Sequence, residues 1–322
     1  MKLLIKNKKC YYSLNKLKLL FIFLHAYNIL FIALTENYQE KKKIKIALCT
    51  MGKGENLYIN EFIEYYLKIG IDHIFIYDDN DPETEKISEI INKKYKYNVT
   101  VNETRKFNIV NQSISFSECY LNHINQYDWF LMVDMDEFLY IVDGTLKSYL
   151  TQKRFNKCDF IKFHWVIPKD NDLIYYDPRP LFERFKPPYI KSKFVKSIIR
   201  GNISDLRYWV HSPFISPFRN TSCTNVGKII YRKNMNFEDL KPINTKMAYI
   251  IHFRYKSTEE LVNKLKRGYK DWFKDNLKNF LIGNIISYLK YNKVTPEKID
   301  FIEKELNLNL SEYIKDINKE NY

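Results

Sequence analysis

The sequence lacks the cysteine patterns that bind zinc. Its five cysteines include no CxxC pair and no Cys/His spacing suited to a zinc site; they are Cys10, Cys49, Cys119, Cys158 and Cys223. Cys10 precedes an apolar segment, so at most four cysteines could pair in an oxidising compartment. Cys49 lies in a short apolar run that we interpret as a buried strand. The spacing leaves both free thiols and disulfides open.

A helix-sized basic stripe is also missing from the main body of the chain. The formal net charge is +14, but residues 1–45 hold ten Lys and two Glu, or +8, which leaves +6 for the other 277 residues. Nucleic-acid-binding proteins gather positive charge on one face or helix. We therefore expect no nucleic-acid partner. With 45% hydrophobic residues in 322, the chain should fold around a large core.

The amino-terminal part carries the one long apolar run, LKLLFIFLHAYNILFIAL at residues 17–34. Its 18 residues are near the lower limit for a helix that spans ~30 Å of hydrocarbon. Lys residues precede and enter the run, and no acidic residue occurs before Glu36, which predicts a cytoplasmic amino terminus. We expect a single-pass type II membrane anchor, with the body in the Golgi or secretory lumen if the source is eukaryotic. A cleaved signal peptide is the alternative.

Beyond residue 44, strand and helix signals alternate. We predict strands at 44–50, 71–77, 97–102, 129–133 and 158–166, and helices at 56–69, 81–94, 113–126 and 258–268. This alternation predicts an α/β fold, a mostly parallel Rossmann-type sheet flanked by helices. Residues 168–225 favour loops and short antiparallel strands, and residues 271–315 are expected to be helical, with one helix starting at Pro296. We divide the chain into 1–43 (tail, anchor and stem), 44–270 (main domain) and 271–322 (helical extension of that domain).

Acidic residues follow the predicted strands at the edge where a parallel sheet binds ligands. Asp134 and Asp136 come directly after the apolar strand WFLMV. Two carboxylates at this spacing can reach one hard cation, Mn²⁺ or Mg²⁺, which leaves positions open for diphosphate oxygens. A solvated acidic turn is the alternative. The pattern predicts a metal site next to a phosphate-bearing ligand.

Several blocks in a fixed order resemble the glycosyltransferases of family 92, which have the GT-A fold. The blocks are MGKGENLYINEFIEYYLKIGIDHIFIYDDND (51–81), WFLMVDMDEFL (129–139), FERF (182–185), KSIIRG (196–201), HSPF (211–214) and IHFRYKSTEELVNKLKRGY (251–269). The resemblance covers about residues 44–270. The family's Lys-Asn-Glu near the first strand is here replaced by Gly-Lys-Gly-Glu at 52–55, so Glu55 matches and its neighbours depart.

The resemblance implies roles for individual residues. Thr50, Glu55 and Asp78 would line the nucleoside pocket, Asp134, Asp136 and His252 would hold the metal, and Arg254 and Lys256 would pair with the phosphates, with Arg267 as a further candidate. Inversion of the sugar needs a general base, for which Glu183 and His211 are the candidates. Glu137 is expected to brace the metal loop. A structural histidine is the alternative for His252, and surface solvation is the alternative for the three cations.

The function expected from this resemblance is the transfer of a hexose, with galactose favoured, from a UDP-sugar to a glycan or glycoconjugate hydroxyl. The reaction would be inverting and dependent on Mn²⁺ or Mg²⁺. Two alternative functions remain compatible with the sequence. One is a metal-dependent phosphohydrolase or nucleotide-sugar hydrolase, because such enzymes also use acidic clusters. The other is a membrane-anchored glycan-binding module without enzymatic activity.

Overall fold

The structure is a computed structural model that describes residues 25, 27, 44–104, 112–204, 206–209, 212–214, 221–230, 241–267, 277–311 and 313. The chain divides into two compact units, Met1–Ile44 and Lys45–Tyr322. Of the predicted membrane anchor at 17–34, only His25 and Tyr27 belong to the described residues. Within the described ranges, no helix is long and apolar enough to cross a membrane.

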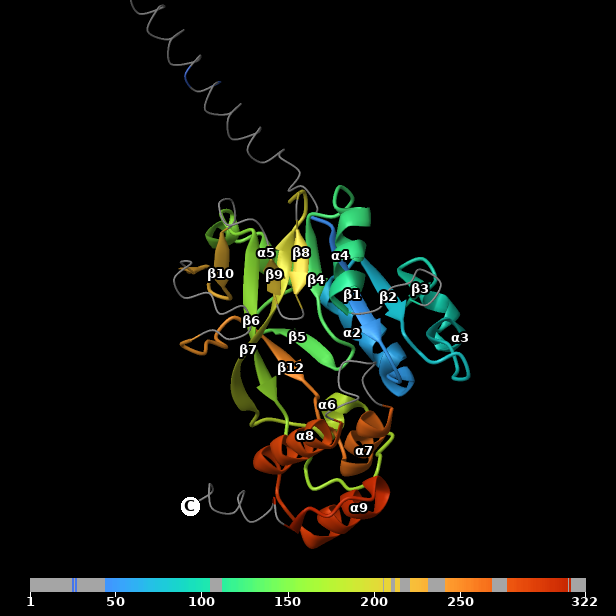
Figure 1. Ribbon diagram of the computed structural model, residues 1–322. Coiled ribbons are helices and arrows are strands. Elements are labelled where there is room, and N and C mark those ends of the chain that lie inside the picture. Colours follow the sequence, from blue (N-terminus) through green and yellow to red (C-terminus); the bar gives the residue numbers. More distant parts are fainter. Residues whose placement is uncertain are drawn as a thin grey trace, which may run out of the picture. The chain divides into compact units, whose positions relative to one another are not determined.

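The first half of the second unit forms a parallel sheet. Its strands are β1 (Ile46–Gly52), β2 (His73–Asp78), β3 (Val99–Glu103) and β4 (Trp129–Met132), in the order β3-β2-β1-β4 (Figure 1). Helix α4 (Gln112–His123) packs against the face of β1 that carries Ala47 and Cys49. Ile46 and Leu48 on the other face are equally buried, so both faces are covered. Strands in such a position consist of continuous apolar runs, as β1 and β4 do.

The first helical segment forms where the periodicity predicts it. A 3₁₀ turn, η1 (Asn56–Tyr58), leads into α2 (Ile59–Ile69). Ile59, Phe62, Ile63 and Tyr66 are buried on one face, which is the 3.6-residue repeat of an amphipathic helix. The helix ends at Gly70, whose φ of 109° suits a residue without a side chain.

The predicted helix at 81–94 is wrong. That segment contains only the short α3 (Ile87–Ile90) and the 3₁₀ turn η2 (Lys93–Tyr95). The Asp78 carboxylate accepts the backbone N–H of Ile87 at 2.9 Å, so the chain turns back to the end of β2 before a helix can begin. Lys86 occupies the N-cap position of α3.

The second half of the unit is mainly antiparallel, as predicted, but contains longer strands than expected. Its strands are β5 (Glu137–Ile141), β6 (Phe160–Ile167), β7 (Ile190–Arg200), β10 (Ser222–Thr224), β11 (Ile229–Ile230) and β12 (Ala248–His252). β7 lies between β4 and β6 and is antiparallel to both. β12 pairs with β5 antiparallel and with β6 in parallel, while β8 (Arg207–Trp209) and β9 (Ser212–Phe214) form a separate ribbon.

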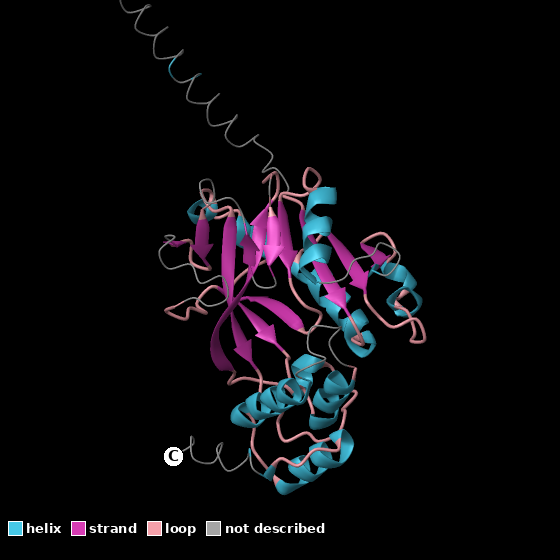
Figure 2. Ribbon diagram, in the orientation of Figure 1, coloured by secondary structure: helices cyan, strands magenta, loops and turns pink. Residues whose placement is uncertain are grey.

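Three helices follow the sheet and share a core of their own. They are α7 (Thr258–Lys266), α8 (Leu277–Tyr291) and α9 (Pro296–Leu306), and they gather beyond the ends of β5, β7 and β12 (Figures 1 and 2). The shorter helical segments are α5 (Leu146–Leu150), η4 (Lys153–Phe155) and α6 (Leu181–Arg184). α9 starts at Pro296 as predicted. α7 begins at Thr258, the first residue of the helix predicted at 258–268, and Glu260 completes a capping box with its N-cap, Ser257.

The predicted α/β fold is therefore confirmed. A parallel, helix-flanked sheet is continued by an antiparallel excursion, and the helices α7, α8 and α9 follow it. The order β3-β2-β1-β4-β7-β6 places the carboxyl ends of the parallel strands, and the loops that follow them, along one edge. This edge is where open α/β sheets bind ligands.

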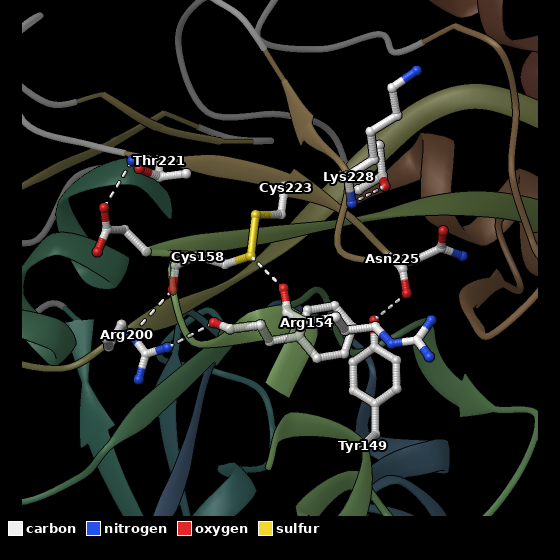
Figure 3. The surroundings of a disulfide bond; sticks show 11 residues. Tyr149, Arg154, Cys158, Arg200, Thr221, Cys223, Asn225 and Lys228 are labelled. Carbon is white, nitrogen blue, oxygen red and sulfur yellow. Dashed lines mark hydrogen bonds between the residues drawn. A yellow bond between two sulfur atoms is a disulfide. The ribbon is translucent and has the colours of Figure 1, made fainter. Parts of the chain in front are cut away.

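Four of the five cysteines form two disulfides. Cys49 of β1 pairs with Cys119 of α4, and Cys158 pairs with Cys223 of β10. Figure 3 shows the second bond. Next to it, the Arg200 side chain donates a hydrogen bond to the carbonyl oxygen of Cys158 at 3.0 Å. The alternative of free thiols at these four positions, which the sequence left open, does not hold.

Candidate active site

The acidic residues lie in the tight turn between β4 and β5. Oε2 of Glu137 accepts the backbone N–H of Asp134 at 2.9 Å, and the backbone N–H of Glu137 donates to the Asp134 carbonyl at 3.1 Å. Burial, followed by the nearby Asp134 carboxylate, raises the pKa of Glu137 well above its ordinary value. Glu137 therefore braces the turn, the role expected of it.

Strand β12 brings His252 to Asp136. His252 is the partner of Glu137 in the β5–β12 ladder, and the N–H of Phe253 donates to the Asp136 carbonyl at 2.8 Å. Nε2 of His252 lies 3.4 Å from Oδ1 of Asp136, and the two side chains are only 8% and 6% exposed. Burial lowers the pKa of His252 even though Asp136 raises it. The imidazole is therefore neutral at pH 7 and can act as a ligand.

Helix α7 places Lys264 on the same carboxylate. Its Nζ lies 2.7 Å from Oδ2 of Asp136. Burial alone would raise the pKa of Asp136, but Lys264 and then His252 lower it well below its ordinary value. Asp136 is therefore ionised, with an imidazole beside one oxygen and an ammonium beside the other.

Asp134 faces a different group of residues. Lys196, fully buried on β7, donates to Oδ2 of Asp134 at 3.1 Å, and Gln112 at the start of α4 donates to Oδ1. Lys196 also lies 3.5 Å from Glu137. Burial would lower the pKa of Lys196, but Asp134 and Glu137 raise it, so this lysine is charged. Of the three predicted metal ligands, the structure brings Asp136 and His252 together and places Asp134 against Lys196.

Glu55 and Lys256, both predicted for the donor site, meet across the pocket, and Arg267 joins them. Oε2 of Glu55 accepts from Lys256 and Oε1 accepts from Arg267, each at 2.9 Å. Burial alone would raise the pKa of Glu55, but Lys256 and Arg267 lower it below its ordinary value. Lys256 has a φ of 55° and lies 4.2 Å from the centre of the Tyr58 ring. A non-glycine residue in this left-handed conformation is held there by its surroundings.

A pocket opens between residues 54–58 and residues 254–267. Four cationic side chains line it, namely Arg254, Lys256, Lys264 and Arg267, against the two carboxylates of Glu55 and Glu260. Arg254 is half-buried and lies over the Tyr255 ring. A concave surface with this excess of positive charge favours an anionic ligand.

One wall of the pocket is fixed by a buried network around Arg184. Its guanidinium donates to Glu260 at 3.1 Å and to the Tyr58 hydroxyl at 2.9 Å, and Tyr58 in turn donates to Glu260. Glu183, the predicted base in the same FERF block, is exposed and does not line the pocket. His211, the other predicted base, lies outside the described residues.

Asp78 and Thr50, both predicted to line the nucleoside pocket, are buried and do not belong to the lining of this pocket. Both carboxylate oxygens of Asp78 accept backbone N–H groups, from Asn80 and Ile87, each at 2.9 Å. Asn80 then accepts the N–H of Gly54 at 2.7 Å and so holds the loop that carries Glu55. Thr50 is fully buried, and its hydroxyl has no hydrogen-bond partner. Asp78 therefore positions, through Asn80, the loop that carries Glu55.

Lys196, Lys264 and Arg184 are site residues that were not predicted from the sequence. Each lies outside the acidic motif and reaches it, or the pocket wall, only through tertiary structure. A signal existed for Lys264: with Arg267 it forms a pair at i and i+3 on an amphipathic helix, and such a pair shares one face. Lys196 and Arg184 lie in the family-like blocks KSIIRG and FERF, but their burial as charged residues could not be predicted from the sequence.

Asp136 and His252 fit a divalent cation as a pair. Two neighbouring ligands of an octahedral ion with bonds of ~2.1 Å lie roughly 3 Å apart, close to the observed 3.4 Å between Oδ1 and Nε2. Behind them, Nδ1 of His252 lies 3.9 Å from Oε1 of Glu137, too far for a hydrogen bond, and neither buried atom has a hydrogen-bond partner among the described residues. In the part of the chain that the structure describes, no three His, Cys, Asp or Glu side chains form a metal-binding cluster.

A family model matches most of the sequence, and individual relatives align with about a third of it. The sequence model of glycosyltransferase family 92 matches residues 42–307. A family 92 protein of Ricinus communis is 28% identical over 106 residues, which cover 33% of this chain and 18% of that protein. Another, from Oryza sativa subsp. japonica, is 28% identical over 121 residues, which cover 35% of this chain and 20% of that protein. The aligned segments thus span about a fifth of these relatives.

Among solved structures, S. aureus TarS matches 81% of this chain and 49% of its own, at 12% identity and a TM-score of 0.31. A likeness of this size is distant, and the fold assignment rests on the strand order described above. The family match, by contrast, covers the whole described sheet, the acidic turn, His252 and α7. The chain belongs to glycosyltransferase family 92.

Proposed function

We propose that this chain transfers a hexose from a UDP-sugar to a hydroxyl of a glycan or glycoconjugate, with Mn²⁺ or Mg²⁺ at Asp136 and His252. The observation that carries the proposal is the meeting of a buried carboxylate and a neutral imidazole beside a pocket with four cationic side chains. A nucleoside diphosphate supplies the negative charge that such a pocket favours. Membership of family 92 makes a sugar donor the natural nucleotide.

The residues around the pocket would bind different parts of the donor, the metal ion and the diphosphate. Oδ1 of Asp136 and Nε2 of His252 would hold the cation, which when bound would act as a Lewis acid toward the departing diphosphate. Lys256 and Arg267 would bind diphosphate oxygens. Because Glu55 already fixes both cations, they need little reordering when the donor arrives.

The acceptor hydroxyl must also be activated. An inverting transfer needs a general base at the acceptor hydroxyl. Glu183 is exposed and away from the pocket, so His211 is the remaining candidate of the two. Galactose is the hexose that we favour, on the family resemblance alone.

We also propose that the domain works in an oxidising compartment, as a lumenal domain behind a type II anchor would. The two disulfides support this, because such bonds persist in secreted and lumenal proteins and are rare in the cytosol. The proposed donor and acceptor chemistry is that of a glycan-building compartment.

Thermal melting with nucleotides tests the donor site. We expect UDP together with Mn²⁺ to raise the melting temperature of the wild-type chain more than either alone. Asp136→Asn should abolish the shift, because it removes the charged ligand. Asp143→Asn should retain it, because Asp143 is exposed in the turn after β5, away from the pocket. If folded wild-type protein shows no shift with any nucleotide and Mn²⁺, the proposed donor site is wrong.

Product analysis separates the alternatives. The chain would be incubated with UDP-hexoses, Mn²⁺ and a panel of oligosaccharides, and the oligosaccharides would be analysed by mass spectrometry. A gain of one hexose supports transfer. Release of free hexose without any modified oligosaccharide would favour a hydrolase, and glycan binding without turnover would favour a binding module.

A further inference from the structure

Lys264 and a divalent cation would compete for the carboxylate of Asp136. Its ammonium lies 2.7 Å from Oδ2 of Asp136, while Oδ1 of the same carboxylate lies beside Nε2 of His252. The Asp136 carboxylate is 6% exposed, and a buried charge of this kind needs a counter-charge. Lys264 provides that counter-charge.

A metal ion at Oδ1 of Asp136 would change the electrostatic interactions of the Lys264 ammonium. The ion carries two positive charges and would lie within a few ångströms of the ammonium, so the two cations would repel each other. The Lys264 side chain is 22% exposed and lines the pocket, which gives it room to turn away from Asp136. An anion in the pocket would then be its favourable partner.

We propose that Lys264 exchanges partners during donor binding, from the Asp136 carboxylate to a phosphate oxygen of the nucleoside diphosphate. The exchange makes the metal and the nucleotide bind cooperatively. Without the nucleotide, Lys264 competes with the metal for Asp136. With it, Lys264 leaves that carboxylate and adds a charge-assisted contact to the phosphate. This inference rests on the proposed donor site and names the residue that couples its two ligands.

Helix α7 offers a matched control for Lys264. Lys266 lies two residues further along, so it projects from a different part of the helix surface. Its ammonium pairs with Glu305 of α9. Lys266→Met thus makes the same chemical change on the same helix without touching the pocket.

The test is the affinity for Mn²⁺, measured by electron paramagnetic resonance with and without UDP. The full chain would be compared as wild type, Lys264→Met, Lys264→Gln and Lys266→Met. We expect both Lys264 variants to bind Mn²⁺ about tenfold more tightly than the wild type when UDP is absent. The factor by which UDP strengthens Mn²⁺ binding should fall by a similar amount, because one coupling free energy governs both ligands. Lys266→Met should behave as the wild type.

The outcomes separate this inference from the proposed function. If the wild type binds Mn²⁺ and UDP cooperatively and both Lys264 variants match it, the exchange is wrong and the donor site stands. If the wild type binds no Mn²⁺ even with UDP, both are wrong. Lys264→Gln can still donate a hydrogen bond to Asp136, so it serves as the folded variant should Lys264→Met fail to fold.

Discussion

At the scale of single residues, the pocket is built by pairing buried charges of opposite sign. Glu55 is held by Lys256 and Arg267, and Asp136 is held by Lys264. Removing one member of such a pair leaves the other buried without a partner, which costs about 3–5 kcal/mol in comparable sites. These residues therefore serve stability as well as ligand binding, and variants need controls that separate the two.

Glu55→Gln should lower the free energy of unfolding by about 3 kcal/mol at pH 7, because it leaves Lys256 and Arg267 without a charged partner. Burial would raise the pKa of Glu55, but these two cations lower it below 4.5 in the folded protein. The stabilisation is therefore complete above pH 4.5 and is lost as the pH falls through the lower folded value. Urea unfolding at a series of pH values would measure it.

The difference in unfolding free energy between the wild type and Glu55→Gln should therefore shrink at acidic pH. A difference in unfolding free energy that stays constant from pH 7 to well below pH 4 would contradict the assigned ion pairs.

Gly54→Ala should weaken UDP binding and cost roughly 1–2 kcal/mol of stability. Gly54 has a φ of 63°, a conformation that costs other residues about that much. A Cβ there would also lie 3.0 Å from Nη1 of Arg267, the side chain that we propose binds a phosphate. Calorimetric titration with UDP and Mn²⁺ would measure the affinity.

Gly283→Ala is the control for that prediction. Gly283 lies within α8, and a Cβ there meets nothing within 4 Å. Alanine should stabilise the helix by about 0.5–1 kcal/mol and leave UDP binding unchanged. Equal effects of the two substitutions on UDP affinity would contradict a role of the Gly54 turn in UDP binding.

At the scale of elements, the parallel half of the sheet followed from the sequence. Continuous apolar runs and helical periodicity located β1, β2, β4 and α2 within a few residues, because burial on both faces leaves a clear compositional mark. The acidic turn after β4 was found for the same reason: it directly follows such a run.

The antiparallel half could not be predicted in the same way. β5 starts within the acidic motif, at Glu137, and its pairing with β12 joins segments more than a hundred residues apart. That pairing brings His252 to Asp136, so the meeting of two candidate ligands depends on a long-range contact. β7 carries Lys196 into the core, where an ion pair with Asp134 overrides the preference of lysine for the surface.

The N-cap of α7 gives a prediction at this scale. The Ser257 hydroxyl accepts the N–H of Glu260, so Ser257→Ala should cost about 1 kcal/mol of stability. Because α7 carries Lys264 and leads to Arg267, loosening its first turn should also lower UDP affinity. Thermal melting and calorimetric titration would measure the two effects.

Thr295→Ala makes the comparable change at the N-cap of α9, away from the pocket. We expect a similar loss of stability without a change in UDP affinity. If Ser257→Ala leaves UDP affinity intact as well, α7 does not position the cations of the pocket.

At the scale of the whole molecule, the pocket depends on three segments that lie far apart in the sequence. The loop after β1 supplies Glu55, the segment after β12 supplies Lys256 and Lys264, and the turn between β4 and β5 places Asp136 against Lys264 from outside the pocket lining. Such a site needs the two halves of the sheet to be held in a fixed relation. β7 does this through hydrogen bonds to β4 on one side and β6 on the other.

The two disulfides strengthen each half separately, and this leads to the last prediction. Cys49–Cys119 fastens α4 to the parallel half, and Cys158–Cys223 fastens β10 to the segment that enters β6. They close loops of 70 and 65 residues, for which the loss of chain entropy in the unfolded state corresponds to about 4 kcal/mol each. Cys158→Ser should therefore lower the unfolding free energy by about 2–4 kcal/mol, and reduction of the wild type should lower it further because both bonds are lost. Alkylation followed by mass spectrometry would show the pairing directly: four cysteines should resist modification until a reductant is added. Modification of Cys158 and Cys223 in the folded, unreduced protein would contradict both the pairing and the oxidising compartment inferred from it.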